Sequence, residues 1–381
     1  MRQNIHVLNY VPFEHDPGNG HVVVALYRLS DHLYRTMLAR GMTLQAYSHT
    51  TDQHYILTGT VQAIVRAVKD WPEATREWRT ALVEALRRAS HAVPQQPLQI
   101  SGWLLPWHRR TLVMGILNVT PDSFSDGGNF TTIDAAVAHA RQLVAAGADI
   151  IDVGGESTRP AGVYAGGADY VTAAEEKARV LPIISRLRAE LDVPISIDTY
   201  KAEVAEAAIA HGAHIVNDVW GLKRDPKMAS VVARHNVPVV VMHNRERTHY
   251  DGPVMREIIN DLWESVDIAQ AAGVREEHII LDPGIGFAKT YDHNIAVMRQ
   301  LQQLTYLGYP VLLGTSRKSF IGKTLDLPID QRVEGTAATV SIGIAKGCRI
   351  VRVHDVQEIT RVCRMTDALL HPHNEEGALL G

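Results

Sequence analysis

Clusters of polar and charged residues follow apolar runs at eight places in the second part of the sequence. In chain order they read NVTPDSFSDGG, GGESTRP, IDTY, NDVWG, MHN, DPGIGF, GTSRKSF and VRVHDV. Each run suits one buried strand, and a strand that only supports a fold needs no such chemistry at its end. The recurrence therefore favours one shared site over a series of ordinary Asp/Ser/Gly turns.

Three of these clusters place hydrogen-bonding side chains directly at the end of a hydrophobic strand, at Asp198, Asn217 and Asp282. A carboxylate that is largely removed from water is costly unless it is paired. Its partner could be a cation of the protein itself. It could instead be a flat heterocycle whose adjacent N–H and NH2 groups bind both carboxylate oxygens. The sequence leaves both possibilities open.

Three other clusters carry cationic or titratable side chains, namely Arg159, Arg317, Lys318, Arg352 and His354. Such groups converging from separate segments suit a phosphate or diphosphate. No GxxxxGK[ST] loop and no GxGxxG turn follows a predicted strand, so the anion is not held in P-loop or Rossmann fashion. Asn118 and the oxygen-rich loop behind it could hold Mg²⁺ through few protein ligands, with water and phosphate oxygens completing the octahedron.

The elements that would bring these clusters together alternate regularly from Thr111 onward. Helical patterns lie between most of the apolar runs, and several end in a Gly-containing step into the next strand, as in AAGADIIDV and AKGCRIVRV. Eight βα units in about 260 residues is the size of a (β/α)8 barrel, whose strand C-termini share one face. We therefore predict an α/β fold with a TIM barrel. A doubly wound open sheet is the alternative, which the even spacing and the missing dinucleotide turn disfavour.

The N-terminal part of the chain has a different pattern. We predict a small α+β domain over residues 1–105 and the barrel over residues 106–381. Apolar spacing predicts strands at 4–10, 43–47 and 54–59 and helices at 22–40, 60–70 and 72–89. Residues 93–97 read as a linker. No chemical motif occurs in this domain, so the sequence predicts no role for it.

Composition narrows the classes of partner. A net charge of −4 offers no basic field for nucleic acid or a membrane surface, and no apolar stretch approaches the length of a membrane span. The two cysteines, Cys348 and Cys363, cannot build a disulfide framework, which is the pattern of a reducing compartment. We expect a cytoplasmic protein that acts on small molecules.

Five of the eight clusters resemble the signatures of the dihydropteroate synthase family: NVTPDSFSDGG, GGESTRP, DPGIGF, SRKSF and VRVHDV. The resemblance runs from about Leu112 to Val356. Each motif alone is moderately specific, whereas five in order at barrel spacing are highly specific. The first 105 residues lie outside the resemblance.

The resemblance implies roles for individual residues around a pterin diphosphate. Asp198, Asn217 and Asp282 would hold the pterin ring, with Lys318 at its other edge and Met242 and Gly314 in the same pocket. Asn118 would bind Mg²⁺ on the diphosphate. Arg352 and His354, with Thr158 and Asn118 nearby, would form the diphosphate site, and Arg159 would also bind substrate.

The resemblance also implies a second subsite and a mechanism. Phe287, Pro160, Thr158 and Ser319 would border the pocket for 4-aminobenzoate, the position that sulfonamides mimic. Loops 122–128 and 157–167 would close over the site. Catalysis would be SN1-like, with Asp282, Lys318, Arg352 and His354 as the catalytic groups that help diphosphate depart and stabilise the pterin cation.

Two other functions suit the same barrel. One is methyl transfer from a methylated folate to a corrinoid protein, which the cationic SRK and VRVH clusters disfavour. The other is non-catalytic pterin binding, which would not need the diphosphate groups. The family also typically forms homodimers through late barrel helices, and the small apolar residues 337–345 (AATVSIGIA) suit such a contact, although they would equally suit packing within one chain.

Overall fold

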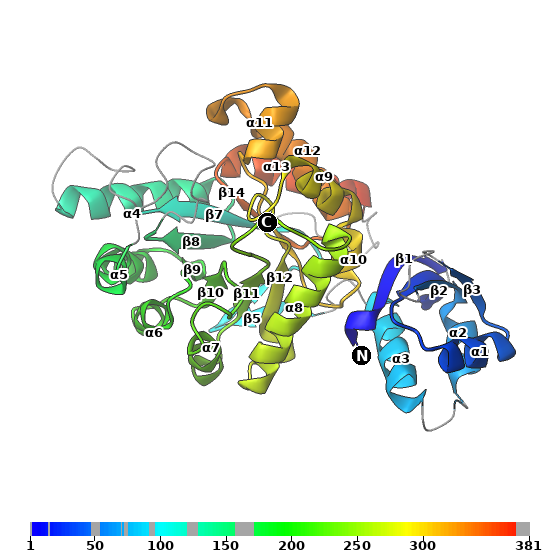
Figure 1. Ribbon diagram of the computed structural model, residues 1–381. Helices are drawn as coiled ribbons and strands as arrows, with labels where there is room; N and C mark the ends of the chain where they lie inside the picture. Colours follow the sequence, from blue (N-terminus) through cyan, green and yellow to red (C-terminus); the bar gives the residue numbers. More distant parts are fainter. Residues whose placement is uncertain are drawn as a thin grey trace.

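The computed structural model describes residues 2–13, 16–46, 54–69, 71, 75–90, 96–119, 129–156 and 171–370. Its N-terminal part is a four-stranded antiparallel sheet with strand order β1-β2-β4-β3 and three helices (Figure 1). Its elements are β1 (Ile5–Phe13), β2 (Asp16–Leu26), α1 (Asp31–Ala39), β3 (Thr43–Ala46), β4 (Tyr55–Thr60), α2 (Val61–Val68) and α3 (Arg76–Ser90). We call residues 2–90 the N-terminal module.

The helix predicted over residues 22–40 is wrong in its first half, because Val22 to Leu26 belong to β2. This run pairs with β1 on one side and with β4 on the other. A short apolar run fits either periodicity, and here its β-branched valines and two strand partners decide for a strand. The helix begins only after Ser30, whose side chain accepts a hydrogen bond from the backbone N–H of Leu33.

The rest of the chain forms a barrel of eight parallel strands, which confirms the predicted fold. The strand order in the sheet is β12-β11-β10-β9-β8-β7-β14-β13, and a parallel bridge between Leu281 and Val311 joins its two edges. The strands are β7 (Leu112–Asn118), β8 (Ile150–Gly154), β9 (Ile195–Asp198), β10 (Ile215–Asp218), β11 (Val239–Met242), β12 (Ile279–Asp282), β13 (Leu312–Leu313) and β14 (Ile350–Val353).

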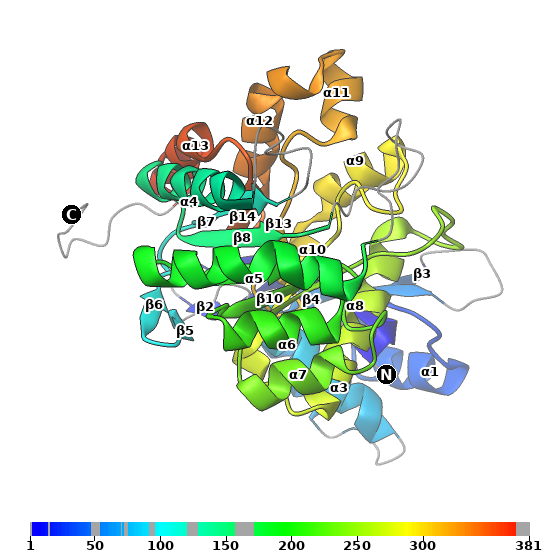
Figure 2. The same ribbon diagram turned by 90° about the vertical axis from the view of Figure 1, so that its left-hand side faces the viewer.

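Helices surround this barrel, and Figure 2 shows α4 to α7 side by side on its outer surface. They are α4 (Asn129–Ala145), α5 (Ala173–Glu190), α6 (Ala202–Ala210), α7 (Met228–His235), α8 (Val254–Ala271), α9 (Tyr291–Gln300), α10 (Gln302–Thr305), α11 (Ser319–Leu325), α12 (Val333–Ala345) and α13 (Val356–Leu370). The predicted Gly-containing steps follow α4, α6 and α12, where Gly147, Gly212 and Gly347 have φ of 105°, 111° and 95°. The sequence reading missed α11, a short extra helix directly after the SRK segment.

Side chains of the barrel strands alternate between two environments. Those pointing outward, such as Val113, Ile151 and Val241, join the large core between barrel and helices. Those pointing inward begin with an apolar layer at the N-terminal end of the strands: Leu112, Met114, Ile150, Ile215, Val240, Ile280, Leu312 and Ile350. A hairpin of β5 (Leu98–Ile100) and β6 (Trp103–Leu105) packs against this layer and closes the floor of the barrel. The division of the chain at residue 105 stays a prediction.

The N-terminal module has its own hydrophobic core and packs beside α8 and α10 (Figure 1). Arg88 on α3 donates to Glu276 at 2.7 Å and lies 5.7 Å from the Trp263 ring centroid. Arg256 on α8 lies 4.0 Å from the ring centroid of Tyr27. No described helix is long and apolar enough to cross a membrane.

Candidate active site

The alternation that gives the barrel an apolar floor gives it a polar upper layer. Two residues further along each strand, the inward positions become Asp152, Ser196, Asn217, Met242, Asp282, Gly314 and Arg352. Asn118, Gly154 and Asp198 continue the same faces at the strand ends, where they are neighbours in register. The predicted convergence of the strand ends therefore occurs, and Asn217, Met242, Asp282, Phe287, Gly314, Lys318, Arg352 and His354 line one pocket.

Arg352 forms the centre of a buried ion-pair network. Its Nε donates to Asp152 Oδ2 at 2.6 Å, and its Nη2 donates to Asp198 Oδ2 at 2.7 Å. Asn217 Nδ2 donates to the same oxygen of Asp152 at 3.1 Å. Two carboxylates thus share one guanidinium, so the network carries one excess negative charge. Burial alone would lower the pKa of Arg352, but Asp152 and Asp198 outweigh that effect and raise it.

The carboxylates keep unused hydrogen-bonding capacity. Asp152 is 0% exposed and Asp198 5%, and the Oδ1 atom of each has no hydrogen-bond partner among the described residues. Burial raises the pKa of Asp198 to about 7, against the opposing effect of Arg352. The sequence left open whether a protein cation or a ligand pairs with these carboxylates. The structure shows the protein cation, Arg352, and each carboxylate still has one buried oxygen that can accept from a ligand with N–H donors.

Asp282 and Lys318 lie on another side of the same pocket. Asp282 Oδ1 accepts a hydrogen bond from the backbone N–H of Gly284 at 2.7 Å, and burial raises the pKa of Asp282 to about 6. Lys318 Nζ lies 4.2 Å from the ring centroid of Phe287. The aromatic face thus holds a cation beside a carboxylate, and both groups face the space that a planar ligand would fill.

His354 is held by Ser316, which the sequence reading did not single out. Ser316 Oγ lies 3.0 Å from His354 Nδ1 and accepts the backbone N–H of His354 at 3.1 Å. Oγ accepts one hydrogen bond and can donate another, and we assign its proton to Nδ1, which makes Nε2 the donor of the ring. Burial and the nearby Arg352 lower the pKa of His354 to about 3, so the imidazole is neutral at pH 7.

Two predicted groups do not belong to this pocket as expected. Arg317 does not line it, because its guanidinium pairs with Asp355 across to the end of β14. Its place in the cationic set stays a prediction, and in the structure its charge is compensated by Asp355. Ser319 begins α11 and is absent from the residues that line the pocket, so its role stays a prediction. Thr158, Arg159, Pro160 and the loops 122–128 and 157–167 lie outside the described residues.

Asp152 is the main residue that the sequence reading missed. It lies inside the run IIDV, which reads as one continuous apolar strand ending at Val153. Counting back by two from Gly154 would have placed it on the inward face. Asn118 was predicted correctly to lie at a strand end, and it is partly exposed beside Gly154. No group of three His, Cys, Asp or Glu side chains suited to a metal occurs in the described part of the chain.

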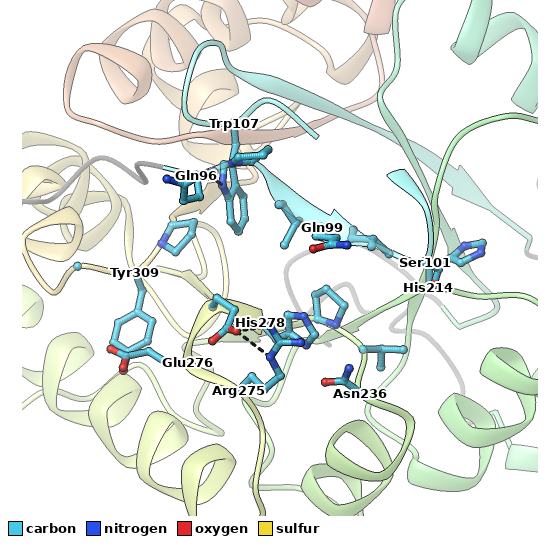
Figure 3. Close-up of a pocket in the computed structure, with 18 of the residues that line it drawn as sticks. Gln96, Gln99, Ser101, Trp107, His214, Asn236, Arg275, Glu276, His278 and Tyr309 are labelled. Atoms are coloured by element: carbon cyan, nitrogen blue, oxygen red, sulfur yellow. Dashed lines mark hydrogen bonds and ion pairs between the residues drawn. The ribbon is translucent and has the colours of Figure 1, made fainter. Parts of the chain in front are cut away.

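A cavity of about 880 Å³ lies at the opposite end of the barrel, between the floor hairpin and α3; Figure 3 shows side chains that line it. Trp107, Gln99, His214 and Tyr309 line it. Four of its charged groups form two pairs, Arg88 with Glu276 and Arg275 with Glu277. Size alone would place the site here, but the unpaired buried carboxylate oxygens and the cationic groups meet at the other end of the strands.

Comparison with known proteins assigns the barrel. The pterin binding enzyme family matches residues 114–354, which places the chain in that class. The chain is 57% identical over 284 residues to dihydropteroate synthase of Bacillus subtilis, covering 74% of this chain and 97% of that protein. The N-terminal module lies before the segment that the family matches.

Solved structures agree with this assignment. A Clostridium difficile dihydropteroate synthase crystallised in the presence of pteroic acid has 54% identity and a TM-score of 0.66, covering 68% of this chain and 97% of that chain. A Xanthomonas albilineans dihydropteroate synthase with 4-aminobenzoic acid has 44% identity and a TM-score of 0.64, covering 68% and 93%. The chain belongs to the dihydropteroate synthase family.

Proposed function

We propose that the chain joins (7,8-dihydropterin-6-yl)methyl diphosphate to 4-aminobenzoate, giving 7,8-dihydropteroate and diphosphate, a step of folate biosynthesis. The observation that carries this proposal is a single pocket in which buried carboxylates lie opposite donor groups. Asp282 lines this pocket and Asp198 lies behind it, paired with Arg352; both would offer acceptors to the N–H and NH2 groups of a pterin, while Lys318, Arg352 and His354 would offer donors.

The reaction that suits these groups begins with loss of the diphosphate. The bond between the pterin methylene carbon and the diphosphate oxygen breaks, and the diphosphate leaves with the electron pair. The lone pair of the aromatic amine then forms the C–N bond, and the amine loses one proton. No described group is placed as a base for the amine before this step, whereas several can stabilise the charges that form.

Individual roles follow from position. Asp198, Asn217 and Asp282 would hold the ring, and the carboxylate of Asp282 would stabilise positive charge that spreads into it. Lys318 and neutral His354 would donate hydrogen bonds, the latter through Nε2 to a diphosphate oxygen. Arg352 is held at two of its nitrogens by Asp152 and Asp198, so the same carboxylates that face the ring orient this cation.

Asn118 would hold Mg²⁺, which supplies charge neutralisation for the departing diphosphate when bound. The donor set fits this ion. A partly exposed amide oxygen at a strand end, with no complete cage of protein ligands among the described residues, suits an ion that keeps water and takes substrate oxygens. Chelation with EDTA should therefore abolish turnover, and added Mg²⁺ should restore it; turnover that persists in EDTA would contradict this role.

Diphosphate release that depends on 4-aminobenzoate tests the reaction against the two alternatives. A folate methyltransferase or a non-catalytic pterin binder would release none. Lys318→Ala and Asp282→Ala should each abolish turnover in folded protein, whereas Lys323→Ala, on the exposed side of α11, should leave it unchanged. Near-normal activity in either site variant would refute the assignment of these roles.

We also propose a homodimer that uses α12 and α13. Ile342, Met365 and Leu369 on these helices are 49%, 60% and 71% exposed, which is costly for three large apolar side chains on neighbouring elements. Ile342→Glu should shift the protein toward monomer in sedimentation velocity, and Leu104→Glu, at the exposed floor hairpin, serves as control. A monomeric wild-type protein would refute the dimer. The cytoplasmic location stays a prediction.

A further inference from the structure

Lys289 lies in the loop between β12 and α9 and is only 8% exposed. Its Nζ makes three contacts: 2.8 Å to His243 Nδ1, 2.9 Å to the carbonyl oxygen of Gly284 and 3.1 Å to that of Phe287. In its protonated form the amine has three N–H donors and no acceptor, so these three acceptors favour that form against burial, which lowers the pKa of Lys289 well below its ordinary value. A lysine is buried in proteins only when it is compensated in this way.

His243, one of the three partners of Lys289, lies on the side away from the loop. Its Nδ1 faces Lys289, which can only donate when charged, so Nδ1 accepts and Nε2 carries the proton. Nε2 lies 3.1 Å from Asp261 Oδ2 on α8, and the same oxygen accepts Arg245 Nε at 2.7 Å. Lys289 therefore connects the β12–α9 loop to the residue that follows β11, and the Nε2 of that residue, His243, faces the Asp261 carboxylate of α8 at ion-pair distance.

The loop that Lys289 closes has an unusual backbone. Gly284, Gly286 and Ala288 have φ of 64°, 83° and 45°, all in the left-handed region. Such conformations persist only when the surroundings determine them, and alanine lacks the conformational freedom of glycine. A Cβ atom on Gly284 would lie 2.0 Å from the carbonyl oxygen of His243, so the loop is also pressed against the end of β11.

The two carbonyl groups that Lys289 holds belong to residues that orient the active site. The N–H of Gly284 donates to Asp282 Oδ1 at 2.7 Å and so fixes the rotation of that carboxylate. The ring of Phe287 lies 4.2 Å from Lys318 Nζ. One buried ammonium thereby holds the supports of both the carboxylate and the cation.

We propose that Lys289 is a positioning residue for the pterin site: through Gly284 and Phe287 it fixes the orientation of Asp282 and Lys318. The inference rests on the proposed function, because it assigns the residue to the alignment of that same reaction. Lys289 touches no substrate in this arrangement. Its effect is on the geometry of the pterin pocket and, through it, on both affinity and turnover.

The full-length Lys289→Met variant tests the inference. Methionine keeps the apolar length of the side chain and removes all three donors. The matched control is Lys346→Met, because Lys346 Nζ also donates to a backbone carbonyl, that of Arg299 at 3.0 Å, and to Gln302 at 2.6 Å, but at the C-terminal end of α12. Steady-state kinetics with both substrates, the Kd of 6-hydroxymethylpterin and thermal unfolding are measured for wild type and both variants, with kinetics well below each midpoint.

We expect Lys289→Met to lower kcat/KM for the pterin diphosphate by about ten-fold or more and to raise the Kd of the pterin, because misplacement by a fraction of an ångström has costs of this order. Lys346→Met should change both by less than about two-fold. Folded Lys289→Met with wild-type kcat/KM and Kd overturns the inference, and so does an equal loss in the control.

A second variant covers failure to fold. Lys289→Gln keeps two donors and is measured in the same way, with a smaller loss expected; if neither variant folds, the lysine serves the fold and the inference is overturned. Wild-type protein that binds pterin but releases no diphosphate would refute the proposed function instead, and the Kd comparison would still test Lys289.

Discussion

Lowering the pH from 8 to 6 should weaken pterin binding by about twenty-fold, or about 1.8 kcal/mol. Burial raises the pKa of Asp198 to about 7 and that of Asp282 to about 6 in the protein without ligand. A carboxyl group must be ionised to accept two N–H donors, so a protonated one must lose its proton when the ring binds. At pH 6 protonation reduces the affinity about 11-fold through Asp198 and about two-fold through Asp282, whereas at pH 8 both groups are essentially ionised.

These two carboxyl groups make folding stability depend on pH with the opposite sign to pterin binding. The effect on binding can therefore be separated from unfolding. Both folded-state pKa values lie above those of an unfolded chain, so the folded state binds protons more tightly. The contribution of these groups to stability therefore decreases as the pH rises from about 4 to about 7. A weaker affinity at pH 6 cannot then be caused by unfolding through these groups.

Isothermal titration calorimetry with 6-hydroxymethylpterin measures this linkage. Titrations at pH 6 in buffers of different ionisation enthalpy should report the release of between one and two protons per site, the sum of about 0.9 and about 0.5. The control is Asp198→Asn, which removes the larger contribution. Protonation of the free pterin affects the titrations of both proteins equally, so it cancels when wild type and Asp198→Asn are compared.

The affinities of wild type and Asp198→Asn should converge as the pH falls, because a protonated aspartic acid and an asparagine carry the same charge. The neutral His354, whose pKa is lowered to about 3, does not titrate in this range. An affinity for pterin that is independent of pH between 6 and 8 would refute the reasoning. An unchanged slope in Asp198→Asn would refute the assignment to Asp198.

Three further predictions concern other charged groups. Arg352→Met removes the cation that two buried carboxylates share, so the free energy of unfolding measured in urea should fall by about 3–5 kcal/mol; a loss below about 1 kcal/mol would contradict the buried pairing. Arg317→Ala should change the inhibition constant of diphosphate by less than about two-fold, because Arg317 is paired with Asp355. A weakening of about ten-fold would show that Arg317 contributes to diphosphate binding. Arg88→Ala should lower the free energy of unfolding by about 2 kcal/mol and leave kcat unchanged. Its contacts join the N-terminal module to the side of the barrel and not to the strand ends. An altered kcat in folded protein would contradict the view that this contact is separate from the active site.

The barrel could be predicted from the sequence because each βα unit repeats the same pattern of an apolar run, a polar cluster and a helical segment. Asp198 and Asp282, predicted at strand ends, are the last residues of β9 and β12, and Asn217 lies next to the last residue of β10. Asp152 was not predicted as a site residue, because it lies inside a continuous apolar run and not at the end of one. For Arg317 the structure shows a pairing that the sequence does not predict, since a cation at a strand end can face the site or a neighbouring carboxylate such as Asp355.

The N-terminal module was harder to predict for a physical reason. Its long β1–β2 hairpin contains the run Val22 to Leu26, which continues into apolar residues at helical spacing, so two periodicities overlap. Pairing with β1 and with β4, whose strand lies about 30 residues later, adds to the β preference of the valines and decides for a strand. Long-range pairing of this kind leaves no local signal.

Helix α8 links the two parts of the chain to each other and to the site. One of its faces meets the N-terminal module through Arg256, Trp263 and Asp267, which pairs with Arg2. Asp261 on the same helix faces the barrel, where its Oδ2 lies 3.1 Å from His243 Nε2. The module therefore packs against the helix whose Asp261 faces His243, the residue that contacts Lys289. Because these contacts lie on different faces of one rigid helix, displacement of α8 would be transmitted to the loop that orients Asp282, whereas loss of single surface contacts of the module would not.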